Sequence, residues 1–219
     1  MTAQVLPNAA LELGEVTSVA DPSSLNRVQV RFLSRGPEGG SLAWALVAAG
    51  FAGDRNGAFL IPDVGTRVVL SCLNGDPRYP VVLGAVWDGS TESPETLEGD
   101  AVDRWSFTGK AGTRIAMIEE SGNSQIVLET AGGNRIEIND NGSSVTITQG
   151  GNEVKLDSGG IKLQSASAVE IEASTFRLTA ASANFDTPLA NFSALVMCQL
   201  LQTNTVVSAT YTPGAGNML

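Results

Sequence analysis

The sequence contains no histidine, which removes two broad groups of chemistry. Ser-His and Cys-His catalytic arrangements need an imidazole, and histidine is also the commonest metal ligand in proteins. The two cysteines, Cys72 and Cys198, stand far apart and show no CxxC spacing, so a zinc site within one chain is not expected. We interpret both as small, buried apolar side chains of a protein that folds in a reducing compartment. No metal and no other cofactor is predicted.

Basic residues are scarce as well. Lys and Arg number 13 against 23 Asp and Glu, which gives a formal net charge of −10. A nucleic-acid-binding domain usually carries a stripe of basic residues, and none is visible in this sequence. Nucleic acid is therefore not an expected partner, and we interpret the acidity as a source of solubility.

The sequence also lacks long apolar runs and is poor in aromatic residues. No run approaches the roughly 18 apolar residues that span a bilayer. The N-terminal stretch has no basic region ahead of an apolar core, so we expect no signal peptide and synthesis in the cytoplasm. Aromatic residues make up 5% of the chain, glycine numbers 24, and helical periodicity is rare. These features predict an all-β protein.

The first half of the chain contains five strand patterns. In RVQVRF, alternation places Val28, Val30 and Phe32 on one face. Five strands with connections rich in Gly and Pro predict a small closed barrel of the OB-fold type, with residues 51–65 as a surface loop. The predicted strands span residues 11–19, 26–33, 42–50, 66–73 and 79–87.

A polar, acidic stretch follows the predicted barrel. Residues 88–103 contain Pro94 and show no apolar periodicity, which is typical of a linker. We predict an OB-fold domain over residues 1–90, a linker over 91–108 and a repeat domain over 109–219.

The repeat domain consists of apolar pairs separated by one polar residue. The pairs recur at intervals that shorten from 11 to 7 residues, and GNRIEI and GNEVKL begin alike. We predict that all of them face a common core. The pairs are Ile115/Met117, Ile126/Leu128, Ile136/Ile138, Val145/Ile147, Val154/Leu156, Ile161/Leu163, Val169/Ile171 and Phe176/Leu178.

A single strand of this kind cannot stabilise itself. Its two apolar side chains contribute about 3–5 kcal/mol when buried, and ordering five or six residues costs at least that much. The strands must therefore stack on neighbours, either in a single-chain β-solenoid or on copies of the chain. Units this short favour a triangular prism of three intertwined chains, and the 18-residue spacing of the two GN motifs keeps the single-chain solenoid open.

The first half resembles the OB-fold of the contractile-tail spike family. The resemblance rests on RVQVRF (27–32), GAFLIP followed by VG (57–65), GDP (75–77) and PVVLG (80–84). This family comprises phage baseplate assembly protein V and the valine-glycine repeat spike proteins of type VI secretion. Asn26 stands where the family usually has Gly, and it can also adopt a left-handed turn. The His-x-His iron site of phage spikes has no counterpart in this chain, which has no histidine.

The resemblance implies both a fold and a function. The fold is an N-terminal five-stranded OB-fold barrel followed by a C-terminal triple-stranded intertwined β-helix needle. The function is that of a non-enzymatic, homotrimeric central spike in a phage virion or phage-tail-like particle. Such a spike joins a baseplate hub protein to the tip and pierces the target cell envelope when the sheath contracts.

The end of the chain is poor in charge, because Asp186 is the one charged residue from Thr179 onward. We interpret this end as an apex that docks a separate PAAR-like tip protein. The candidate docking residues are Tyr211, Pro213, Met218 and Leu219.

Two other readings remain open. A carbohydrate-binding or adhesin-like β-solenoid would stack sugar on Trp44 or Trp87, both of which we interpret as barrel or rim packing. We expect Trp105 to close the upper end of the needle's core. A polysaccharide-degrading β-helix would need paired carboxylates. Glu119/Glu120 and Glu170/Glu172 are such pairs, but we interpret Glu170 and Glu172, which flank Ile171 in an expected strand, as a solvated face. We interpret the Asp76-Pro77 and NDNG (139–142) stretches as turns. No catalytic residue is predicted.

Overall fold

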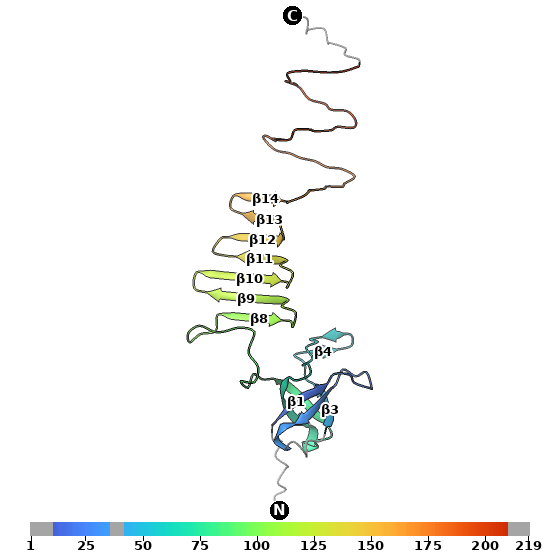
Figure 1. Cartoon of the computed structure of the whole chain (residues 1–219), viewed down its shortest axis with the longest axis vertical. Coiled ribbons are helices and arrows are strands. Elements are labelled where there is room, and N and C mark those ends of the chain that lie inside the picture. The colour runs from blue at the N-terminus through green and yellow to red at the C-terminus, as the bar shows by residue number, and fades with distance from the viewer. Residues whose placement is uncertain (1–10, 36–41, 210–219) are drawn as a thin grey trace, which may run out of the picture. The chain divides into compact units, whose positions relative to one another are not determined.

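A computed structural model describes residues 11–35 and 42–209 of the chain. All of its extended elements are β-strands, joined by turns and two short 3-10 segments, η1 (Leu33–Arg35) and η2 (Leu73–Gly75). Within the described ranges no helix is long and apolar enough to cross a membrane. The strands form a closed barrel, a seven-stranded sheet and one small hairpin (Figure 1).

The barrel confirms all five strands predicted for the first half. Its strand order is β1-β2-β3-β7-β6, and every pairing is antiparallel except that of β3 with β7. The strands are β1 (Glu12–Ser18), β2 (Val28–Phe32), β3 (Leu42–Val47), β6 (Arg67–Cys72) and β7 (Pro80–Ala85).

The barrel core follows from alternation along the strands. Val28, Val30 and Phe32 are fully buried while the residues between them are partly exposed. Gly14 on β1 leaves room for the buried Leu70 side chain, because a Cβ there would lie 2.5 Å from the Cδ1 of Leu70. The buried core is formed by Val16, Val28, Val30, Phe32, Ala45, Val68, Leu70 and Val82.

The turn between β1 and β2 is organised by one carboxylate. The Asp21 side chain accepts hydrogen bonds from the backbone N–H groups of Ser23, Leu25 and Arg27, and from the Arg27 guanidinium at 2.8 and 3.0 Å. The Arg27 guanidinium holds the pKa of the Asp21 carboxyl well below its usual range. Asn26 has a φ of 56°, as expected for a residue that replaces a turn glycine.

Two expectations for the connecting segments and the cysteines need correction. The segment 51–65 is not a simple loop, since β4 (Ala52–Gly53) pairs with β5 (Asn56–Gly57) around a tight turn. Cys198 is exposed rather than buried, whereas Cys72 packs partly buried against the barrel core. The Asp76 turn is confirmed, because its backbone N–H donates to the Leu73 carbonyl between β6 and β7.

The second sheet is an antiparallel meander in sequence order, β8 to β14 (Figure 1). Each of the first six predicted apolar pairs lies in one of its strands, and its first strand lies inside the segment predicted as linker. Consecutive strands pair within the chain, which is neither the parallel stacking of a single-chain solenoid nor the strand-by-strand intertwining of three chains expected from the sequence. The strands are β8 (Arg104–Thr108), β9 (Arg114–Glu120), β10 (Asn123–Glu129), β11 (Arg135–Asn139), β12 (Ser144–Gln149), β13 (Asn152–Asp157) and β14 (Gly160–Gln164).

The NDNG stretch turns the chain between β11 and β12, as the sequence indicated. The Asn139 side chain accepts a hydrogen bond from the Gly142 backbone N–H at 3.0 Å. The Ser143 N–H donates to the Asp140 carbonyl, and Ser143 has a φ of 43°. Asp140 is therefore part of a hairpin turn.

The chain divides into two units, and the second begins at Val169. Residues 169–209 contain no strand and all of them are exposed. The strands expected around Val169/Ile171 and Phe176/Leu178 are therefore not formed in the single chain. The physical reason is that a short strand is stable only beside another strand.

Replacing Asp21 with Ala should lower the thermal unfolding temperature of the barrel. It should also make that temperature change less as the pH is lowered. The folded-state pKa of Asp21 lies below its unfolded value. Its contribution is therefore complete above about pH 4 and is lost as the pH falls through the folded pKa. Circular dichroism melts between pH 7 and pH 2 would measure both effects. Asp54→Ala, on the β4–β5 turn, is the matched control, and equal behaviour of the two variants would contradict this assignment.

Candidate assembly surface

One face of the β8–β14 sheet carries two continuous columns of apolar side chains. Direct pairing across the strands aligns two such residues from each of the seven strands. We call these residues the apolar face. One column contains Phe107, Ile115, Leu128, Ile136, Ile147, Val154 and Leu163, and the other contains Trp105, Met117, Ile126, Ile138, Val145, Leu156 and Ile161.

The apolar face is largely exposed in the single chain. Exposed fractions run from 39% for Leu128 and Ile136 to 72% for Ile161, while Val145 and Val154 are partly buried. Soluble single chains rarely expose so continuous an apolar surface, and such surfaces mark interfaces. Covering the apolar face would stabilise an assembly by on the order of 10 kcal/mol per chain. Full burial of one such side chain contributes roughly 1.5–3 kcal/mol, and only a part of that remains to be gained by side chains that are already partly covered.

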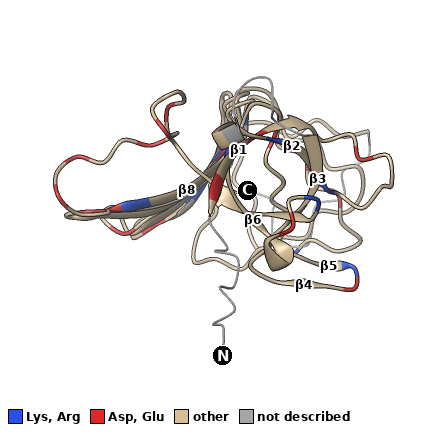
Figure 2. Ribbon diagram, turned by 90° about the horizontal axis from the view of Figure 1, so that it is seen from below, with Lys and Arg blue, Asp and Glu red and all other residues tan. Residues whose placement is uncertain are grey.

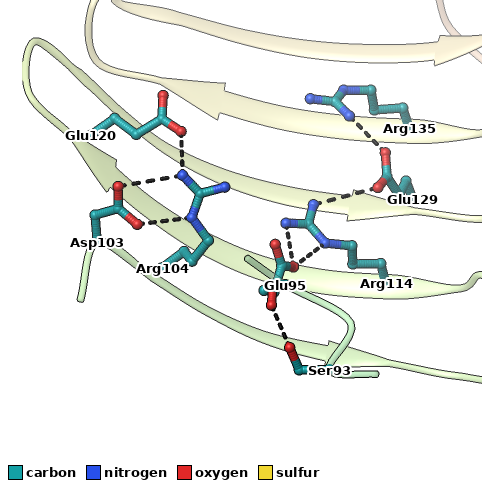
Figure 3. Close-up of polar contacts among 8 residues, drawn as sticks. All are labelled: Ser93, Glu95, Asp103, Arg104, Arg114, Glu120, Glu129 and Arg135. Carbon is teal, nitrogen blue, oxygen red and sulfur yellow. Dashed lines mark hydrogen bonds and ion pairs between the residues drawn. The ribbon is translucent and has the colours of Figure 1, made fainter. Parts of the chain in front are cut away.

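The opposite face of the sheet, here called the polar face, buries a small cluster of Ala116, Ile118 and Val127 and otherwise carries polar side chains with a chain of alternating charges (Figure 3). Arg114, Glu129 and Arg135 lie directly opposite one another on β9, β10 and β11. Glu129 contacts both arginines, at 3.4 and 2.7 Å. Arg135 reaches Glu137 at 2.7 Å, and Glu95 from the linker contacts Arg114 at 2.7 Å. We call these five residues the Arg–Glu ladder.

A second group of charges lies at the β8–β9 end of the polar face. Arg104 contacts Asp103 at 2.8 Å and Glu120 at 2.7 Å. The hydrogen bond to Asp103 raises the pKa of Arg104, and the same contact lowers the pKa of Asp103.

The Arg–Glu ladder shows the same electrostatic pattern. The hydrogen bond to Glu137 raises the pKa of Arg135 against the opposing effect of burial. Burial raises the pKa of Glu95, but hydrogen bonds from Ser106 and Arg114 outweigh it, so the net shift is downward. These contacts hold the neighbouring strands in register.

The structure brings together twelve of the sixteen residues predicted to form a core. They lie on the apolar face, from Ile115 on β9 to Leu163 on β14. Four others, Val169, Ile171, Phe176 and Leu178, lie outside any strand and are 60–68% exposed. The candidate docking residues Tyr211, Pro213, Met218 and Leu219 lie outside the described residues.

The sequence reading missed two parts of this surface. The first part is Phe107, which extends the apolar face onto β8 beside Trp105, a residue already expected at the upper end of the core; the alternation in RWSFT was the available signal. The Arg–Glu ladder was also missed, because sequence spacing does not show which charges lie opposite each other before the hairpin registers are known.

The residues weighed for sugar binding or catalysis do not converge. The Arg27 guanidinium lies over the Trp44 ring, 5.8 Å from its centroid, while Trp87 is 67% exposed beyond the end of β7. Glu170 and Glu172 are exposed and lie outside any strand, which corrects their expected place in one. Over the described ranges, no group of three or more His, Cys, Asp or Glu side chains is placed to hold a metal ion.

Comparison with known proteins links the barrel to one family. Residues 12–87 match the family model described as the type VI secretion system/phage-baseplate injector OB domain. We call these residues, which are similar to that family, the injector OB domain. The span runs from the first residue of β1 to just beyond the end of β7, so it coincides with the closed barrel.

Curated relatives of the chain include spike proteins. The chain is 30% identical over 92 residues to the type VI secretion system spike protein VgrG3 of Vibrio cholerae, covering 36% of this chain and 9% of the relative. It is 30% identical over 105 residues to the spike protein VgrG1c of Pseudomonas aeruginosa, covering 45% and 14%. A third relative, 31% identical over 104 residues, is the actin cross-linking toxin VgrG1 of V. cholerae, with 39% and 9% covered. The matches thus span less than a fifth of these relatives.

The motifs that carry the family resemblance serve the injector OB domain as core and turn residues. Val28, Val30 and Phe32 of RVQVRF are core residues, and Val82 of PVVLG joins them. Gly65 and Gly75 have φ values of 86° and 74°, which favour glycine. The matched segment is therefore structural.

Replacing Glu129 with Ala should lower the free energy of unfolding of the sheet by about 1 kcal/mol, because partly exposed ion pairs contribute little individually. The loss should shrink at high salt, which screens these charges. Chemical denaturation at 0.05 and 1 M NaCl would measure both, with Glu92→Ala in the linker as control. A loss that does not depend on salt would contradict an electrostatic role for the ladder.

Proposed function

We propose that this protein is the homotrimeric central spike of a contractile injection machine, either a phage tail baseplate or a phage-tail-like particle. The injector OB domain connects the spike to a baseplate hub, and the repeat domain forms a needle that pierces the target cell envelope. The role is mechanical and non-enzymatic. Support comes from the family of the barrel and from the spike proteins among its relatives.

The observation that carries the proposal is the uncovered apolar face. Three copies of the sheet, arranged as the sides of a prism, would direct their apolar faces to a common axis and their polar faces to solvent. Each strand supplies two apolar side chains to that axis, as a narrow triangular core requires. The Arg–Glu ladder then lies on the outside, where charges keep their hydration.

The two parts of the repeat domain would assemble differently. Residues 104–164 already pair within one chain, so each copy supplies a complete side of the prism. Residues 169–209 form no strand in the single chain, yet they continue the apolar pattern with exposed Phe185 and Phe192. Their backbone N–H and C=O groups would pair between copies, and the three chains would wind around each other there. The proposal thus limits the intertwining, which the sequence had suggested for the whole repeat domain, to its last part.

Winding gives the spike kinetic stability. Chains that share strand hydrogen bonds along the needle cannot separate one contact at a time, so dissociation requires many bonds to break together. A charge-poor end such as the one beyond Thr179 is an aggregation hazard when exposed, and assembly would bury it. The final residues would present an apex for a PAAR-like tip protein.

Replacing Ile138 with Asp should weaken the trimer by roughly a hundredfold or more, because a carboxylate would be buried at the apolar axis without a partner. Ile138 lies in the middle of its column and is 42% exposed in the single chain. Sedimentation velocity across a range of concentrations would measure the change. Thr146→Asp, on the polar face of the adjacent strand, should leave the trimer intact, and equal weakening of both variants would contradict the assigned core face.

Replacing Phe185 with Asp should remove the resistance of the trimer to warm SDS without dissociating it in native buffer. Phe185 lies in the segment proposed to wind and is 80% exposed in the single chain. Unboiled gel electrophoresis would show the loss, with Ser182→Asp as the matched control. A variant as resistant as the wild type would mean that the winding segment does not hold the chains together.

The role in the machine requires a separate test. Particles assembled without this chain should fail to penetrate target cells, and Ile138→Asp particles should share that defect while Thr146→Asp particles function. Electron microscopy of the tail end and a killing or infection assay would give the readout. Full activity of particles that lack the chain would contradict the proposed function.

A further inference from the structure

One side chain of the acidic linker differs from its neighbours. From Trp87 to Val102 every residue is exposed except Glu95, whose side chain is 20% exposed. Its carboxylate accepts hydrogen bonds from the Arg114 guanidinium, with Nε at 2.8 Å and Nη2 at 2.7 Å, and from the Ser106 hydroxyl. Arg114 lies on β9, on the polar face of the sheet (Figure 3), and Ser106 lies on the same face of β8.

We infer that Glu95 pins the linker to the polar face of the sheet, so that residues 88–103 act as a strap with one short hinge rather than as an open tether. The other acidic residues of the linker, marked red in Figure 2, are exposed up to Asp103. The acidity of the linker alone therefore does not explain why Glu95 contacts the sheet.

The pin is attached to an ordered part of the sheet. Arg114 also contacts Glu129 at 3.4 Å, a contact that orients its guanidinium without help from Glu95. Less side-chain entropy is therefore lost when the contact forms. The approach to the pin is stiff as well, because Pro94 fixes its own φ and the Ser93 hydroxyl donates to the Glu95 carbonyl at 2.6 Å.

A second pin holds the barrel end of the linker. The Asp88 carboxylate lies 3.5 Å from the Arg67 guanidinium on β6 and accepts a hydrogen bond from the Ser90 backbone N–H. Residues 89–94 remain between the two pins. An extended chain reaches at most about 3.6 Å per residue. The segment from Asp88 to Glu95 can therefore span at most about 25 Å, whereas the segment from Asp88 to Arg104 could span about 58 Å.

The consequence is a large restriction of motion. With Glu95 in place, bending between the barrel and the sheet is confined to residues 89–94. Without it, the free segment would extend as far as Val102. The pin belongs to a single chain, so it operates whatever number of copies assemble.

Thermolysin cleavage before Leu97 in the full-length protein would test the strap. Leu97 is 47% exposed, and a protease needs a mobile stretch around the bond that it cuts. Glu95→Ala should raise the cleavage rate about tenfold, and Glu95→Gln, which keeps the shape but loses the charge, should give an intermediate rate. In the wild-type protein, raising NaCl from 0.05 to 0.5 M should increase the rate by weakening the ion pair.

Glu98→Ala is the matched control, because it removes the same charge three residues along the linker, where the side chain is exposed. It should leave the cleavage rate and its salt dependence unchanged. Far-UV circular dichroism would confirm that each variant keeps its strands. Wild-type cleavage rates in Glu95→Ala, or equal acceleration in Glu98→Ala, would overturn the strap. Either result would leave the trimeric spike unaffected.

Discussion

Two columns of apolar side chains run along the β8–β14 sheet, and none of the described residues covers them. The rest of the repeat domain depends on this constraint. Because the hairpin registers align every apolar pair, one face is wholly apolar at its centre and the other carries the charges. A slip of one residue in any hairpin would place isoleucines among the arginines of the Arg–Glu ladder. The ladder and the apolar columns thus specify the same register from opposite faces.

The barrel and the repeat domain solve the problem of burial in different ways. The barrel closes on itself and buries Phe32 and Leu70 completely, so a single chain provides its core. The sheet remains open, and the described residues beyond it, 165–209, form no strand. We therefore regard the barrel as a module that folds alone and the repeat domain as one that is completed by copies of the chain. The Glu95 strap joins these modules by a hinge of a few residues.

Sequence reading succeeded where a local pattern determines the structure. Alternation in RVQVRF located β2, and the NDNG stretch located a hairpin, because these patterns depend on neighbouring residues alone. The pairs from Ile115 to Leu163 were located for the same reason. The β4–β5 hairpin and the contact of Glu95 with Arg114 could not be found this way. They depend on tertiary placement, and residues 19 apart in sequence meet only after the sheet has formed. The missing strands after Val169 show a further limit, because a pattern can require a partner strand that the same chain does not provide.

The central claim is that the apolar face is covered by copies of this chain around a threefold axis. The most direct test is the molar mass of the full-length protein in solution by light scattering. The account predicts a particle of three times the chain mass of 22.7 kDa at every concentration tested. A monomer would show that the apolar face needs no copy of the chain, and a dimer would replace the prism with a two-sheet sandwich. Either of those masses would contradict the account.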